Sequence, residues 1–129
     1  MPDEERAPFA YATIRVVPRV EREEFINVGV VLFSRPRRYL ALRTGLDPKR
    51  LRALWPELDL EAVARQLAVL EAVARGDPAG GAMAQWPQAE RFGWLTAPAS
   101  TAVQPGPVHP GLARDPAAAL DDLFAALVG

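Results

Sequence analysis

The chain contains no cysteine and only one histidine, His109, among its 129 residues. Without cysteine it forms no disulfide and has neither thiolate metal ligands nor a cysteine nucleophile. A single imidazole also excludes a metal site built from several histidines. We therefore expect no bound metal and no cofactor.

Long apolar runs are also missing. No stretch reaches the ~18 apolar residues that a membrane-spanning helix needs, and the N-terminal sequence MPDEERAPFAY is acidic where a secretory signal is basic and then apolar. These absences predict a cytoplasmic protein with no membrane partner. The 50% hydrophobic content suits a single domain over residues 1–129, with residues 1–8 as a flexible N-terminus.

A strong excess of basic charge is the third absence. The formal net charge is -1, although residues 1–50 carry ten basic and seven acidic side chains while residues 51–129 carry five and nine. This balance argues against general nucleic-acid binding, which is the least favoured function here. Such binding would use the N-terminal arginines: Arg15, Arg19, Arg22, Arg35, Arg37 and Arg38.

The most prominent feature that is present is the apolar segment FINVGVVLF, residues 25–33. It is rich in branched residues and lacks the 3.6-residue periodicity of a surface helix, which indicates a central strand buried on both faces. Residues 9–17 alternate between apolar and polar and predict a second strand. Residues 39–43 predict a third strand, so the three strands form an antiparallel meander.

The pairing of the first two strands is predicted from their apolar residues. The favoured register sets Arg15 opposite Asn27 and Thr13 opposite Gly29. These four residues then form a polar patch on one face of the hairpin. The other face is uniformly apolar, with one row from each strand: Ala12, Ile14 and Val16 against Ile26, Val28 and Val30.

Two interpretations of the polar patch stay open. In the functional one, Arg15 and Asn27 bind a small ligand or a partner chain, and Gly29 allows a close approach to the backbone. In the structural one, Asn27 satisfies a bulge or loop carbonyl while Arg15 pairs with a glutamate of the preceding loop, such as Glu24. Arg22 of the same loop is a further candidate for binding.

Helix signals follow the meander. Three times an aspartate precedes an apolar periodic segment, and twice it is followed by proline, which suits the first turn of a helix. The predicted helices cover residues 47–55, 59–75 and 115–128. Residues 91–104 predict one or two short strands split at Pro98, and residues 105–115 predict a loop.

These elements predict the α+β class, with an antiparallel β-meander of three to five strands and two or three helices packed on one face. His109 is the sole candidate for acid-base chemistry near neutral pH, with Ser100 as a nominal nucleophile and Gln104 as a hydrogen-bond donor. No motif surrounds them, so we commit to no catalytic residue. We hypothesise that the loop from Ser100 to His109 packs over the Arg15/Asn27 patch and forms one shallow site with it.

Three segments together carry a family resemblance: RVVP at residues 15–18, EFINVGV at 24–30 and QPGPVH at 104–109. With these segments the chain resembles the bacterial family known as domain of unknown function 3037, from about residue 9 to residue 128. Ala99 stands where the family pattern leads us to expect arginine. The resemblance also implies a genomic neighbourhood with a kinase similar to the HipA toxin.

Three functions remain. A non-catalytic, regulatory partner of a HipA-like kinase is favoured because the catalytic residues are few. A small enzyme using His109 with Ser100 or Glu24 is the first alternative, and nucleic-acid binding is the second. A homodimer is physically reasonable in each case, since a small meander has exposed strand edges.

Overall fold

The computed structural model describes residues 5–99 and 101–129. Its described part contains one five-stranded antiparallel sheet and four α-helices, which confirms the α+β class. The elements in chain order are β1 (Ala7–Val16), the 3-10 turn η1 (Val20–Arg22), β2 (Ile26–Ser34), β3 (Tyr39–Thr44), α2 (Pro48–Leu54), α3 (Leu60–Arg75), the 3-10 turns η2 (Pro78–Gly80) and η3 (Ala82–Gln85), α4 (Gln88–Leu95), β4 (Val103–Pro105), β5 (His109–Ala113) and α5 (Pro116–Leu127).

The pairing of β1 with β2 follows the expected register only at one end. Arg15 lies opposite Asn27 as expected, but a β-bulge between Ile14 and Arg15 shifts the register by one residue, so Ile14 lies opposite Gly29. The extra residue is Val28. A bulge of this kind leaves one residue of a strand without a partner across the ladder.

Beyond the bulge, each side chain of β2 lies on the face of the sheet opposite to the one expected. Thr13 lies opposite Val30, so its expected pairing with Gly29 was wrong. The expected neighbour of Ala12 was also wrong, because Val31 takes that place and Val30 packs on the other face with Leu120. The shift is tolerated because β2 carries apolar residues at both odd and even positions, so apolar side chains face the buried surface on either side of the sheet.

The fourth and fifth strands lie end to end along the free edge of β1. β4 pairs with the C-terminal half of β1 and β5 with its N-terminal half, both antiparallel. The expectation of a loop over residues 105–115 was therefore wrong. Pro107 and Pro110 suggested a loop, but proline is tolerated on an edge strand, where its missing N–H faces away from the ladder.

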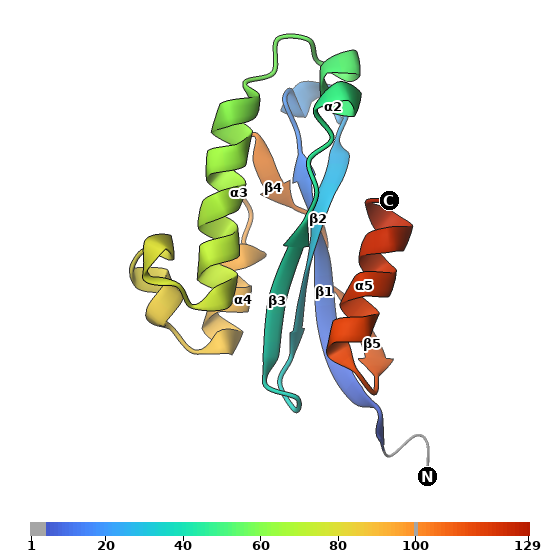
Figure 1. Cartoon of the computed structure of the whole chain (residues 1–129), viewed down its shortest axis with the longest axis vertical. Coiled ribbons are helices and arrows are strands. Elements are labelled where there is room, and N and C mark those ends of the chain that lie inside the picture. The colour runs from blue at the N-terminus through green and yellow to red at the C-terminus, as the bar shows by residue number, and fades with distance from the viewer. Residues whose placement is uncertain (1–4, 100) are drawn as a thin grey trace.

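Helices cover both faces of the sheet. In Figure 1, α3 and α4 lie on one side of the strands and α5 lies on the other. The expected packing of two or three helices on one face holds for α3 and α4, and α5 additionally covers the other face. The physical reason is β2, which carries apolar residues on both faces because of its bulge and so requires cover on each.

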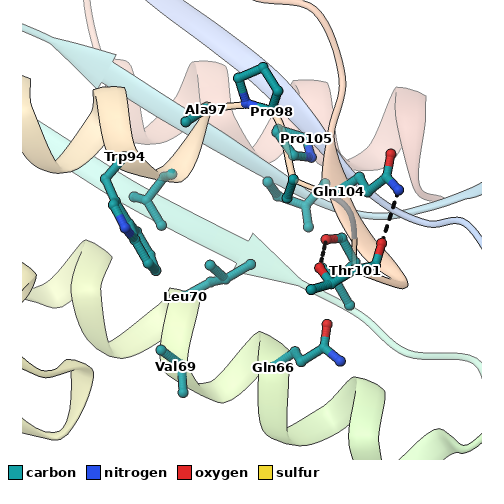
Figure 2. A pocket seen from close by; sticks show the side chains of 13 residues that line it. Gln66, Val69, Leu70, Trp94, Ala97, Pro98, Thr101, Gln104 and Pro105 are labelled. Atoms are coloured by element: carbon teal, nitrogen blue, oxygen red, sulfur yellow. Dashed lines mark hydrogen bonds between the residues drawn. The ribbon is translucent and has the colours of Figure 1, made fainter.

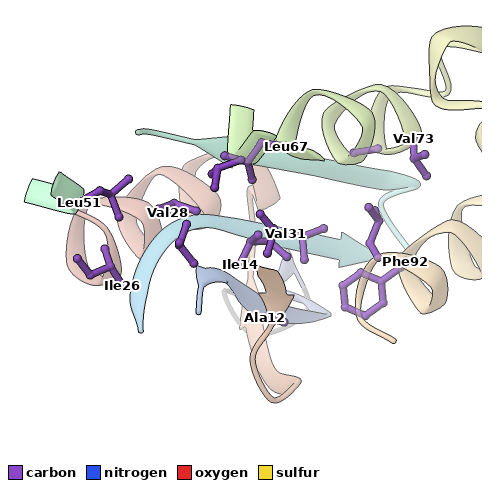
Figure 3. Packing of buried hydrophobic residues seen from close by; sticks show 14 residues of the cluster. Ala12, Ile14, Ile26, Val28, Val31, Leu51, Leu67, Val73 and Phe92 are labelled. Carbon is purple, nitrogen blue, oxygen red and sulfur yellow. The ribbon is translucent and has the colours of Figure 1, made fainter. Parts of the chain in front are cut away.

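Each face has its own apolar cluster. The larger one joins Ile14, Val28 and Val31 of the sheet to Leu67 of α3 and Phe92 of α4 (Figure 3). The smaller one lies under α5 and has three buried members: Val30, Leu32 and Leu120. Strand β2 contributes to both clusters and therefore couples the two halves of the molecule.

The helix α4 replaces strands that were expected within residues 91–104. Two of its apolar residues, Phe92 and Leu95, are buried against the larger cluster. Arg91 fixes the helix by donating to the carbonyl oxygens of Val73 and Ala74 at 3.1 and 2.9 Å. This packing outweighs the strand propensity of the aromatic and β-branched residues here. At the end of the segment, residues 103–105 pair in the sheet as β4.

None of the helices in the described ranges is long and apolar enough to cross a membrane.

Candidate functional site

Part of one sheet face extends past α5. The helix packs on β2 and β3, and Phe9 and Tyr11 of β1 pack beside its apolar cluster. Thr13 and Arg15 follow on the same face of β1. We call this surface the open face and define it by Tyr11, Thr13, Arg15, Phe25 and His109. Its exposure is greatest at His109 and at Phe25, whose side chain is 44% exposed.

Arg15 is the central charged group of the open face. Its side chain is partly buried, and the guanidinium carbon lies 3.8 Å from the centre of the Phe25 ring. The expected pairing with Glu24 was wrong, because Glu24 accepts a hydrogen bond from Nε of Arg22 at 2.6 Å at the exposed end of the hairpin. No carboxylate in the described part of the chain pairs with Arg15.

Asn27 lies directly across the ladder from Arg15. Its Nδ2 donates to the carbonyl oxygen of Leu127 at 3.2 Å, so it caps the last turn of α5. Its Oδ1, like Nε of Arg15, is enclosed and has no hydrogen-bond partner among the described residues. Buried, unpartnered polar atoms on two residues that face each other across the ladder are unusual in a folded protein and single out this position.

Gly106 brings the β4–β5 connection against the open face. A Cβ added at this glycine would lie 2.6 Å from Oγ1 of Thr13 and 3.0 Å from Cζ and Nη2 of Arg15. Its backbone N–H donates to the carbonyl oxygen of Thr13 at 2.8 Å. Any side chain here would displace the guanidinium, so the absence of one is what allows this close approach.

The predicted loop residues lie beside the patch. Gln104 is the backbone partner of Arg15, and is therefore about 10 Å from Asn27 by strand spacing. Its Nε2 donates to the carbonyl oxygen of Thr101 at 2.9 Å. This arrangement is what the hypothesis of one shallow site requires, and the site itself remains a hypothesis.

His109 lies further along the same edge. It is the backbone partner of Tyr11, and the two rings are 5.4 Å apart and tilted by 35°. Within residues 5–99 and 101–129 no carboxylate orients the exposed imidazole. Ser100, the nominal nucleophile, lies outside the described residues, so its relation to His109 stays a prediction.

A second feature, on the opposite face, was not found from the sequence. An apolar hollow of about 380 Å³ lies between α3, the end of α4 and residues 97–99 and 101–105 (Figure 2). We call it the apolar hollow. None of the described residues in its walls is titratable: they are Ile14, Gln66, Val69, Leu70, Trp94, Leu95, Ala97, Pro98, Ala99, Thr101, Val103, Gln104 and Pro105.

The sequence held a weak signal for this hollow. Val69 is an apolar residue within α3, yet it is 41% exposed. Pro98 interrupts an otherwise apolar segment. Neither feature predicts a concavity, because the hollow exists only where the segment after α4 crosses beside α3. Among the predicted binding residues that the structure describes, Gln104 is the one that lines it.

The remaining predicted residues, Arg22 and Glu24, line a third and more polar cleft of about 860 Å³ near the α2–α3 connection. They pair with each other there. As for metals, the described residues contain no group of three carboxylate, thiolate or imidazole side chains that could hold an ion.

Comparison with known proteins gives one match. The model of a family described as "Protein of unknown function (DUF3037)" matches residues 11–128, nearly the whole chain. The chain matches no curated protein and no solved structure.

Proposed function

Since the chain belongs to the DUF3037 family of proteins of unknown function, we propose that it is a non-catalytic binding module that accepts an apolar side chain of a partner protein in the apolar hollow. The observation that carries this proposal is the open concavity of about 380 Å³ with apolar walls. Binding sites of this size range are typically apolar with a few hydrogen-bonding groups.

The chemistry of the walls supports binding over catalysis. Proton transfer requires a titratable group within hydrogen-bond reach of the substrate, and none of the described residues along the hollow is one. The carboxamide of Gln66 also lines the hollow, and such a group suits the N–H and C=O groups of a peptide beside an apolar anchor. Nε2 of Gln104 and the hydroxyl of Thr101 already donate to the carbonyl oxygens of Thr101 and Val103.

The exposed rim supports a protein as the occupant. Val69 contributes a 41% exposed apolar side chain beside the hollow, so the apolar surface extends beyond the concavity. An apolar pocket with an apolar rim suits the central anchor of a protein interface, where one or two buried side chains carry most of the binding energy.

A kinase similar to the HipA toxin is the partner that we propose to test first. The family resemblance of the chain implies such a kinase as a neighbour in the genome, and a binding hollow whose described walls carry no titratable group suits a regulatory subunit. Regulation would then appear as a change in the autophosphorylation rate of the kinase.

The test is co-purification of the chain with the kinase encoded beside it, followed by that rate measurement. The decisive variant is Val69→Asp, which places a charge at the rim of the hollow without entering the core. Leu112→Asp is the matched control, because Leu112 is an exposed apolar residue of β5, 59% exposed and outside the hollow.

We expect Val69→Asp to reduce the amount of co-purified kinase at least tenfold and Leu112→Asp to leave it unchanged, with equal melting temperatures for both variants. Equal binding by Val69→Asp and the unsubstituted chain would refute the hollow as the interface. Absence of any complex would refute this kinase as the partner.

A further inference from the structure

We propose that the open face binds an anionic group, a carboxylate or a phosphate, at the guanidinium of Arg15. This site lies on the face of the sheet opposite the apolar hollow, so the inference does not depend on the proposed function. Four observations support it: the missing counter-charge, the fixed orientation of the guanidinium, its unpartnered Nε and the neighbouring hydroxyl.

Arg15 is a partly buried arginine with neither a carboxylate partner nor a hydrogen bond to a carbonyl oxygen among the described residues, whereas the partly buried Arg91 donates to three carbonyl oxygens. Several partly or fully exposed arginines form ion pairs with nearby carboxylates although water already solvates them: Arg19, Arg22, Arg43, Arg75 and Arg114. Arg15 is more enclosed than these, yet within residues 5–99 and 101–129 its one charge-stabilising contact is the ring of Phe25. A cation that loses water without gaining a counter-charge is poorly compensated, and an anion would supply the difference.

The guanidinium is held in one orientation. Phe25 covers one of its faces at 3.8 Å, and Gly106 approaches it so closely that an added Cβ would lie 3.0 Å from Cζ and Nη2. These contacts leave the terminal nitrogens as the groups that can donate outward. A planar fork whose orientation is already set binds a carboxylate or phosphate at a lower entropic cost than a freely moving side chain.

The guanidinium is not saturated by the protein. Nε of Arg15 is enclosed and has no hydrogen-bond partner among the described residues, whereas Oδ1 of Asn27 is an acceptor and takes no part in binding an anion. Thr13 lies two residues from Arg15 on the same face of β1, and its Oγ1 adjoins Gly106. Its hydroxyl can therefore donate to an anion that sits on the guanidinium.

The experiment is an NMR titration of the full chain with inorganic phosphate, with acetate and with chloride at constant ionic strength. The Nε–H of Arg15 is enclosed and therefore exchanges slowly enough to observe, and it reports directly on the guanidinium. We expect a saturable shift of this signal with phosphate or acetate and none with chloride. The anion with the tighter apparent affinity identifies whether the site prefers phosphate or carboxylate.

Variants separate a site from a structural side chain. For Arg15→Gln we expect the saturable response of the neighbouring backbone amides to disappear. For Phe25→Leu, which alters an exposed ring, we expect an affinity about 2- to 5-fold lower, because the stacking that orients the fork is lost. Arg22→Gln is the matched control and leaves the titration unchanged.

Two results would overturn the proposal. One is a response of equal size with chloride, which shows a general salt effect. The other is a saturable shift that persists in Arg15→Gln with the native melting temperature, which places the anion elsewhere. Loss of kinase binding in Val69→Asp bears on the hollow alone, so the two proposals fail separately.

Discussion

At the scale of single residues, Tyr39 shows how a side chain acquires its properties from distant parts of the chain. It begins β3 and lies opposite Ser34, but the groups that affect its ionisation come from the last helix. Burial raises the pKa of the Tyr39 phenol above 10, and the negative charges of Asp121 and Asp115 raise it further. Each of these effects disfavours the phenolate.

The first prediction concerns the pH dependence of stability. Because the pKa of Tyr39 is raised in the folded state, the unfolded chain loses its phenol proton first as the pH rises. The contribution of Tyr39 to the free energy of unfolding is therefore complete below pH 10 and is lost above it. We expect Tyr39→Phe to be less sensitive to alkaline pH than the unsubstituted chain in urea denaturation between pH 9 and 11.

A carboxylate substitution controls for this assignment. Asp121→Asn removes one of the two charges that raise the pKa of Tyr39, so the alkaline absorbance titration of the phenol should shift to lower pH. Asp122→Asn, one residue further along α5, should shift it less. An equal shift in both variants would show that the effect depends on total charge and not on Asp121.

At the scale of elements, α3 and α4 are joined by one side chain. Arg91 of α4 donates from Nη1 to the carbonyl oxygens of Val73 and Ala74, which are among the last of α3. Its Nε donates to the carbonyl oxygen of Trp86 at 2.9 Å. Carbonyl oxygens at the end of a helix have no partner within the helix, and here the next helix supplies one.

The second prediction tests this connection. Arg91→Lys keeps the charge but cannot donate to three carbonyl oxygens that lie in different directions. We expect the free energy of unfolding to fall by about 1–3 kcal/mol in urea denaturation, since hydrogen bonds from charged donors contribute this much. Arg65→Lys, on the exposed side of α3, is the control and should change stability little. A similar small change in both would mean that water replaces the three bonds.

At the scale of the whole molecule, one sheet serves two cores. The cluster under α3 and α4 and the cluster under α5 lie on opposite faces, and both include residues of β2. A strand that is buried on both faces cannot lose one cover without exposing apolar surface. The two halves should therefore unfold together.

The third prediction is that a destabilising substitution in the cluster on one face also lowers the urea midpoint at which the cluster on the other face unfolds. Leu120→Ala removes buried methyl groups from the smaller cluster and should lower the free energy of unfolding by about 2–5 kcal/mol. Trp55 and Trp94 pack against the larger cluster, on the face opposite the cluster under α5. Their fluorescence should nevertheless report the same lowered urea midpoint as far-ultraviolet circular dichroism.

The control for this prediction is Leu54→Ala, whose side chain is 59% exposed on α2 and should contribute little. Separate midpoints for fluorescence and circular dichroism in Leu120→Ala would contradict a single cooperative unit. They would show that α5 leaves the sheet before the larger cluster opens.

Much of the fold followed from local patterns. The strand around residues 26–34 was predictable because branched apolar residues without helical spacing suit a doubly buried strand. The helices at residues 48–54, 60–75 and 116–127 were predictable because aspartate accepts backbone N–H bonds at a helix start, as it does at all three. The placement of Arg15 opposite Asn27 followed from the same alternation.

What the sequence by itself determined were therefore the signals that depend on neighbours along the chain: periodicity, caps and the first pairs of a hairpin. Only the tertiary structure decided the bulge at Val28, the helix at residues 88–95, the edge strand at residues 109–113 and the apolar hollow. Each of these depends on a contact between segments far apart in sequence, such as Arg91 with the end of α3 or β5 with β1. Local propensity is too weak to determine such contacts, because burial and backbone hydrogen bonding across the fold outweigh it.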